Sequence, residues 1–86
     1  MKLNKDYVLR EVANTWVVLP LQGADLDGIM KLNESGVLLW NALEQGADIA
    51  KLAETLTAEY EVTIEQAKSD VKEFIALLQH YGCLEV

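Results

Sequence analysis

The stretch at residues 29–36 reads IMKLNESG and combines two patterns that predict different secondary structure. Its first half, residues 29–32, is a short apolar run that follows Gly28, as expected of a brief β-strand. Its second half begins with Asn33, whose side chain can cap a helix, and Glu34, whose charge suits the positive end of a helix dipole. The chain therefore changes from strand to helix here, and the flanking sequence agrees with that change.

Two further strands are predicted before this stretch, at residues 7–12 and 16–19. Both are rich in β-branched or aromatic residues, and residues 13–15 between them suit a turn. Pro20 ends the second run, because proline cannot donate to a sheet ladder. A polar, glycine-bounded loop at 22–28 then leads to the third strand. This order predicts a three-stranded antiparallel meander.

Three helices are predicted after the stretch, and the third runs from Ile64 to about Tyr81. The segment beginning at Thr63 has the pattern of a capping box, in which Gln66 reaches back to the cap amide. The other expected helix boundaries are Asn33 and Asp48 at N-termini, and Gly46 and Gly82 at C-termini. The fold class predicted is α+β, with a three-stranded antiparallel sheet followed by three helices in a single domain, residues 1–86. Residues 83–86 either add a short strand or pack against the domain without forming one.

Composition narrows the class of protein. The 86 residues are 51% hydrophobic, enough for one core, and carry 7 Lys+Arg against 14 Asp+Glu, a net charge of −7. That charge repels phosphate backbones and disfavours nucleic acid as a partner. The start, MKLNKDY, lacks the apolar run of a signal peptide, and no stretch approaches the length needed to span a membrane. A lone cysteine fits a reducing compartment, so a cytoplasmic protein is expected.

The third helix has an unusually wide apolar face. On a helical wheel centred on Phe74 the apolar arc covers about 160°, wider than burial on one neighbour requires. Leu77 lies on one flank of this arc, and Ile64 and Ile75 lie on the other. Lys68, Lys72 and Gln79 follow just beyond that second flank. Two interpretations stay open: the helix serves both its core and a partner, or it is simply well buried.

The segment 29–36, with Trp40 four residues later, resembles the LNETG…W signature of the PqqD family, named for coenzyme PQQ synthesis protein D. The other matching residues are 7–12, Asp70, Val71, Phe74, Leu78 and 82–85. Two departures are minor: Ser35 stands where threonine is common, and Cys83 where leucine or isoleucine is usual. The resemblance covers nearly the whole chain, although each piece alone is unspecific.

The resemblance implies a winged-helix-like recognition element for ribosomally made, post-translationally modified peptides (RiPPs). In such a module the leader segment of a precursor peptide adds as a strand beside the third strand and is held against the third helix. A separate maturase, often a radical-SAM enzyme, modifies the core peptide. The resemblance thus implies a non-catalytic adaptor with no cofactor and no metal, whose partners are a leader peptide and a maturase.

An exposed third strand is also a physical template for an added strand, because one row of its N–H and C=O groups is unpaired. The peptide contacts predicted on this basis are Ile29, Met30, Lys31, Leu32, Ile64, Lys68, Val71, Lys72, Ile75 and Gln79. Val71 lies near the centre of the arc and is equally well explained as core. Because Lys68 and Lys72 are neighbours on the helix, the bound peptide is expected to be apolar at alternate positions with at least one acidic residue.

Other functions stay open at this point. The arrangement of helices also suits a winged-helix DNA-binding domain, although the third helix has no arginine. A docking module for another protein, and homodimers formed by edge-strand pairing, use the same exposed strand. His80 and Cys83 are close enough in sequence for a dyad or a metal site, but they have no evident third partner. The segment 25–28 resembles part of a calcium loop without its downstream glutamate.

Overall fold

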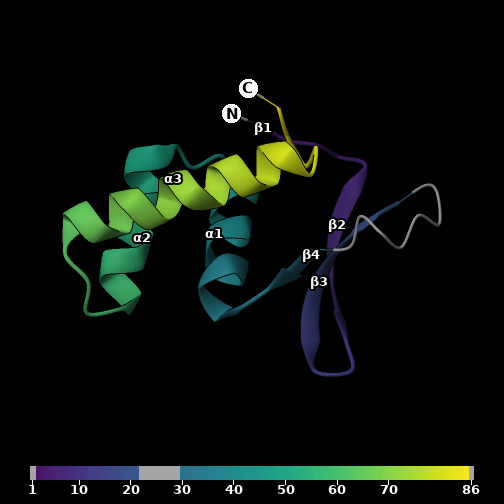
Figure 1. Ribbon diagram of the computed structural model, residues 1–86, viewed down its shortest axis with the longest axis horizontal. Helices are drawn as coiled ribbons and strands as arrows, with labels where there is room; N and C mark the ends of the chain where they lie inside the picture. Colours follow the sequence, from purple (N-terminus) through teal and green to yellow (C-terminus); the bar gives the residue numbers. More distant parts are fainter. Residues whose placement is uncertain (1, 22–29, 86) are drawn as a thin grey trace.

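The computed structural model describes residues 2–21 and 30–85, and it has the expected α+β architecture (Figure 1). An antiparallel sheet in the order β2-β3-β4 precedes three helices, as predicted. The strands of this sheet are β2 (Tyr7–Val12), β3 (Thr15–Pro20) and β4 (Met30–Leu32). The helices are α1 (Glu34–Glu44), α2 (Ile49–Glu59) and α3 (Ile64–His80).

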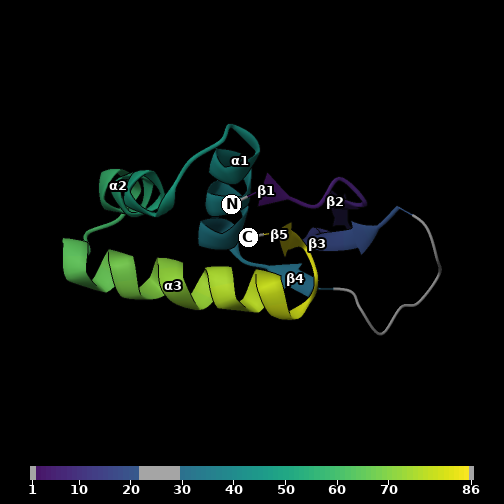
Figure 2. The ribbon, with the colours of Figure 1, turned by 90° about the horizontal axis from the view of Figure 1, so that it is seen from above.

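A second, two-stranded sheet joins segments from the two ends of the sequence. β1 (Lys2–Leu3) pairs antiparallel with β5 (Leu84–Glu85), so that Leu3 lies opposite Leu84. The backbone N–H of Asn4 extends the pairing by donating to the Cys83 carbonyl at 2.7 Å. Figures 1 and 2 both draw the N- and C-terminal segments close together. The sequence left open whether the C-terminal segment forms a strand, and the structure shows that it does.

β2 and β3 are joined by a two-residue hairpin. Ala13 and Asn14 both have positive φ, at 51° and 66°, while Val12 and Thr15 face each other across the ladder. Positive φ at both central residues is the type I′ pattern, whose twist matches that of paired strands. The turn predicted at residues 13–15 is therefore present, but Thr15 already belongs to β3.

Local sequence explains where the helices begin. Asn33, Asp48 and Thr63 each accept a backbone N–H from the residue three positions later, as N-caps do. The capping box expected at Thr63 is only half formed: Gln66 donates its side-chain amide to Asp70 Oδ1 at 2.8 Å. An acceptor one turn ahead on α3 thus engages the group that was expected to reach back to the cap.

The ends of two helices are fixed by glycines in the left-handed region. Gly82 follows α3 with a φ of 78°, and its N–H donates to the Gln79 carbonyl. The next N–H, from Cys83, donates to the Leu78 carbonyl at 2.9 Å, which completes a Schellman motif. Gly46, with a φ of 90°, ends α1 in the same way. Both glycines were predicted as helix ends from the sequence.

One core holds the sheet and the helices together. Its largest fully buried side chain is Trp40 of α1, and Val18 of β3 and Leu52 of α2 are 0% exposed. α3 contributes a continuous buried face made of Ala67, Val71, Ile75 and Leu78. Figure 2 shows α1 and α2 on the same side of α3, which explains why only one face of α3 is buried.

The Asn33 cap supports a first prediction. Replacing Asn33 with alanine removes the oxygen that accepts the Gly36 N–H at 2.9 Å and should lower the free energy of unfolding by about 1 kcal/mol. Urea unfolding followed by circular dichroism measures the change. Asn41→Ala is the control, since Asn41 is exposed on the same helix. Equal effects of the two substitutions would show that the cap contributes nothing special.

Candidate functional site

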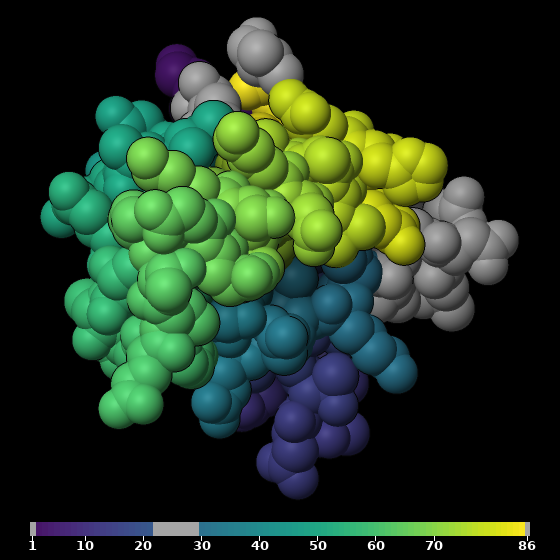
Figure 3. Space-filling model, turned by 60° about the vertical axis from the view of Figure 1, so that its left-hand side comes forward, coloured from purple at the N-terminus to yellow at the C-terminus, as the bar shows by residue number. Residues whose placement is uncertain are grey.

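A cleft of about 1060 Å³ lies between β4 and the first turn of α1 on one side and α3 on the other. In Figure 3 the green-to-yellow surface of α3 lies along the blue-teal surface of β4 and α1. The first wall consists of Lys31, Leu32, Asn33, Glu34, Ser35, Gly36 and Leu39; the end of α2 and the turn after it add Leu56, Tyr60 and Val62; and α3 contributes Asp70, Glu73, Phe74 and Leu77. These side chains make the cleft largely apolar, with a few charged groups among them.

β4 is the strand that borders this cleft, and it lies at the edge of its sheet. It pairs with β3 through Trp16↔Leu32 and Val18↔Met30, and none of the other described strands pairs with its second side. Met30 and Leu32 are buried, whereas Lys31 between them is exposed. An edge strand of this kind presents N–H and C=O groups to which an extended peptide can add.

The first turn of α1 is held tightly against β4. Asn33 Oδ1 accepts hydrogen bonds from the Gly36 N–H and the Ser35 hydroxyl, both at 2.9 Å. A Cβ on Gly36 would lie 3.2 Å from Leu32 Cβ, which is closer than such atoms usually approach. Glycine at this position therefore lets the helix start directly behind the strand, and the strand edge is fixed relative to α1.

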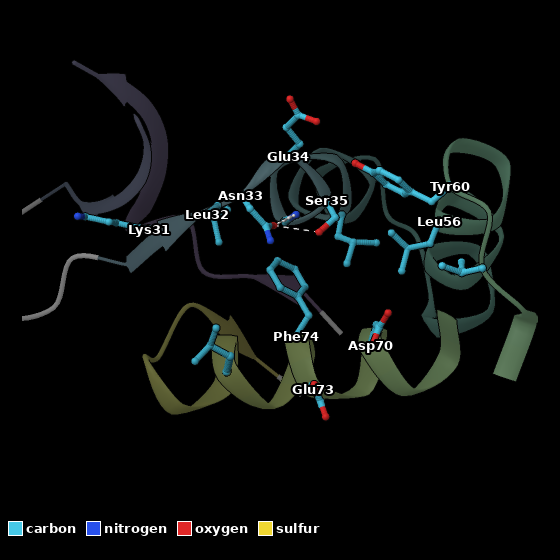
Figure 4. A pocket seen from close by; sticks show the side chains of 14 residues that line it. Lys31, Leu32, Asn33, Glu34, Ser35, Leu56, Tyr60, Asp70, Glu73 and Phe74 are labelled. Carbon is cyan, nitrogen blue, oxygen red and sulfur yellow. Dashed lines mark hydrogen bonds between the residues drawn. The ribbon is translucent and has the colours of Figure 1, made fainter. Parts of the chain in front are cut away.

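The α3 wall combines apolar and acidic groups. Leu77 is 40% exposed, and Phe74 is half-buried beside the core. Figure 4 shows the Phe74 ring and the Asp70 carboxylate rising from α3 towards α1, whereas Glu73 projects from the other side of the helix. The half-buried Asp70 lies one turn before Phe74 on the same face, so an acidic group lies beside the apolar surface.

The predicted strand contacts Met30, Lys31 and Leu32 form β4. Lys31 and Leu32 line the cleft, and Met30 belongs to β4 but is only 4% exposed. Ile29, also predicted as a contact, lies outside the described residues. The edge strand and the cleft are thus adjacent.

The predicted helix contacts lie along a different edge of α3 from the cleft. Val71 is 0% exposed and Ile75 7%, so both belong to the core, which answers the question that the sequence left open for Val71. Ile64, Lys68, Lys72 and Gln79 are exposed, but none is among the residues that line the cleft. These four residues remain a predicted contact surface, separate from the cleft between β4 and α3.

The sequence did contain a signal for the flank of α3 that lines the cleft. An arc about 160° wide has two edges, and Leu77 lies on the edge opposite Ile75. The interpretation chose the edge that carries the two lysines. The cleft-lining residues that were not among the predicted contacts are Asn33, Glu34, Ser35, Gly36, Leu39, Leu56, Tyr60, Val62, Asp70, Glu73, Phe74 and Leu77. Deciding between the edges requires knowing on which side of α3 the strand lies, and that depends on tertiary packing.

Cys83 is a buried residue of the core. It is 1% exposed, and burial raises the pKa of its thiol from 9.0 to about 11. A nucleophilic cysteine needs the opposite shift, because the thiolate is the reactive form. The described residues contain no group of three or more His, Cys, Asp or Glu side chains that could hold a metal ion. The segment 25–28, weighed as part of a calcium loop, lies outside the described residues.

The raised pKa of Cys83 predicts a pH dependence of stability. Because the native state favours the protonated thiol, its contribution is fully present below pH 9 and is lost as pH rises to about 11. The loss should reach about 2–3 kcal/mol in the free energy of unfolding. Urea unfolding between these pH values measures it. Cys83→Ala should show a shallower decline, and parallel curves for the two proteins would contradict the assignment.

None of the helices in the described part of the chain combines the length and apolar character needed to cross a lipid bilayer.

Comparison with known proteins adds independent findings. The family model for coenzyme PQQ synthesis protein D (PqqD) matches residues 15–84. The fold is similar to a solved structure of TbiB1 in complex with the TbiA(beta) leader peptide, with a TM-score of 0.83 and 26% identity over 99% of this chain and 95% of that one. It is also similar to a lasso peptide synthetase B1 complexed with the leader peptide, with a TM-score of 0.79 and 24% identity over 95% and 93% of the two chains. No curated protein sequence matches significantly.

Proposed function

The chain belongs to the PqqD family, and from this premise we propose that it is a non-catalytic adaptor for a ribosomally made precursor peptide. The adaptor binds the leader segment of the precursor and presents the remainder to a modifying enzyme. The observation that carries the proposal is the cleft between the edge strand β4 and α3, in a fold whose solved relative TbiB1 is a complex with a leader peptide.

The proposed binding mode is strand addition beside β4. Backbone groups of the leader pair with the free edge of β4, and alternate side chains turn towards Phe74 and Leu77. About four hydrogen bonds of roughly 1 kcal/mol each and two apolar side chains of about 2 kcal/mol each give about 8 kcal/mol. Ordering the leader costs about 2–5 kcal/mol, which leaves about 3–6 kcal/mol, so the expected dissociation constant lies between roughly tens of micromolar and several millimolar. Such an affinity allows the precursor to be released after modification.

The proposed partners follow from an adaptor role. In this proposal the leader is held by backbone pairing, and its core peptide stays free for a second protein that carries out the chemistry. A radical-SAM or other maturase is the proposed partner. The buried, protonated Cys83 gives this chain no activated thiol of its own. DNA binding is disfavoured by the net charge of −7 and by the balanced charges of the α3 surface.

The experiment that tests the proposal is an amide-shift titration of the ¹⁵N-labelled protein. The ligand is a synthetic leader, the N-terminal half of a short precursor once a neighbouring reading frame is found to encode one, and a scrambled peptide of the same composition is the control. The largest shifts are expected at Lys31, Leu32, Phe74 and Leu77. Binding without shifts in β4, or salt-dependent binding of arbitrary duplex DNA in place of the peptide, would contradict the proposal.

A further inference from the structure

The cleft carries an uneven distribution of charge. Among the described residues that line it, Glu34, Asp70 and Glu73 are acidic and Lys31 alone is basic. Figure 4 shows the Lys31 side chain pointing away from Asp70, at the opposite end of the cleft. The Asp70 end of the cleft is therefore negatively charged, and Lys31, at the other end, is too far along the cleft to neutralise that charge.

Asp70 is the carboxylate that faces the interior of the cleft. It is half-buried, and in Figure 4 it points towards α1, whereas Glu34 and Glu73 project outward. Its Oδ1 accepts one hydrogen bond, from Gln66 at 2.8 Å. Within the part of the chain that the structure describes, no lysine, arginine or histidine forms a salt bridge with it. A carboxylate has room for several more donors, so Asp70 has unused acceptor capacity.

The surroundings of Asp70 suit a cation on a long apolar stem. Leu56 and Val62 line the same cleft, and Figure 4 shows the Phe74 ring beside Asp70 and the Tyr60 ring across the cleft, near the end of α2. Arginine and lysine side chains cover apolar surface with their methylene groups and stack on aromatic rings with their charged ends. A guanidinium group also matches a carboxylate through two parallel hydrogen bonds.

We propose that the peptide held in the cleft carries an arginine or lysine that pairs with Asp70, at the end of the cleft opposite Lys31. This inference rests on the proposed function and specifies its ligand. The peptide side chain proposed here is basic, whereas Lys68 and Lys72 led to the expectation of an acidic one; neither lysine lines the cleft. An acidic peptide side chain at the same point would face Asp70 without a compensating cation, and an apolar one would leave the carboxylate partly desolvated and unpaired.

Selection from a displayed library of random dodecapeptides tests the inference without knowledge of the natural leader. The wild-type protein should enrich apolar peptides that contain arginine or lysine well above the frequency in the starting library. Asp70→Asn protein should still enrich apolar peptides but lose the excess of basic residues. Apolar peptides without a basic excess, or an excess that persists with Asp70→Asn, would overturn this inference alone. Failure to enrich any peptide, together with a leader titration that shifts no amide of β4 or α3, would overturn the proposed function and this inference with it.

A charge exchange on one selected peptide distinguishes pairing from an indirect structural effect. Replacing its basic residue by glutamine should weaken binding to the wild-type protein by about 3- to 10-fold, and Asp70→Asn should remove most of that difference. Asp70→Lys protein should bind a version of the peptide with glutamate in place of the basic residue better than the original. Glu65→Gln, on the opposite side of α3, is the matched control and should change neither affinity by more than about twofold. Equal losses for Asp70→Asn and Glu65→Gln would refute the pairing.

Discussion

Leu77→Gln is expected to weaken binding of the leader peptide by about 10- to 100-fold, while the domain stays folded. Leu77 is 40% exposed and lines the cleft, so a bound apolar side chain would cover it. Glutamine has a similar length but puts a polar amide where the peptide must exclude water. Fluorescence anisotropy with a labelled leader measures the affinity, and circular dichroism checks the fold.

Ile64 supplies an unusually close control for this experiment. It is 41% exposed on the same helix, nearly the same as Leu77, but lies on the edge that the sequence interpretation chose. Ile64→Gln should leave the affinity within about twofold, because no bound residue covers it in the proposed mode. If Ile64→Gln weakens binding and Leu77→Gln does not, the peptide lies along the Lys68–Lys72 edge, and the cleft is not the binding site.

Val71→Asp is expected to unfold the domain or to lower its Tm by about 20 °C or more. Val71 is 0% exposed within the core, and a carboxylate there would be buried among apolar side chains. Substitutions of this kind cost more than about 4 kcal/mol, a large part of the roughly 5–15 kcal/mol that stabilises a domain. Thermal unfolding measures the effect, and the expected change in Tm follows from the small size of the chain.

Lys72→Asp is the matched control, since it introduces the same side chain at the next position. Lys72 is exposed, so the substitution should change stability by no more than about 0.5 kcal/mol. A folded Val71→Asp protein with normal stability would mean that this position faces a groove and that the core of α3 is misassigned.

Much of the fold could be predicted because its signals are local. Asn33, Asp48 and Thr63 each cap a helix by accepting the N–H of the residue three positions later. Gly46 and Gly82 end helices because their own φ angles are positive. The β-branched runs of β2 and β3 likewise predict strands on either side of a turn. These features depend little on the rest of the molecule.

The candidate site was predicted less completely because it depends on which elements meet. The width of the apolar face of α3 was visible in the sequence, but the side on which β4 lies was not. The Gln66 side chain could reach back to the cap N–H or forward to Asp70, and only the structure shows that it bonds Asp70. β1 is two residues long and carries no periodic signal; its pairing with β5 is specified by contacts across the whole chain.

The register that places Trp16 opposite Leu32 gives the protein two tryptophans in different surroundings. Trp40 is 2% exposed in the core, whereas Trp16 is 37% exposed and is the cross-strand neighbour of a residue that lines the cleft. A peptide that covers Leu32 should therefore change the emission of Trp16 and leave that of Trp40 nearly constant, while denaturation changes both. Two single-tryptophan proteins, Trp16→Phe and Trp40→Phe, would turn the unlabelled domain into separate optical reporters of folding and of peptide capture.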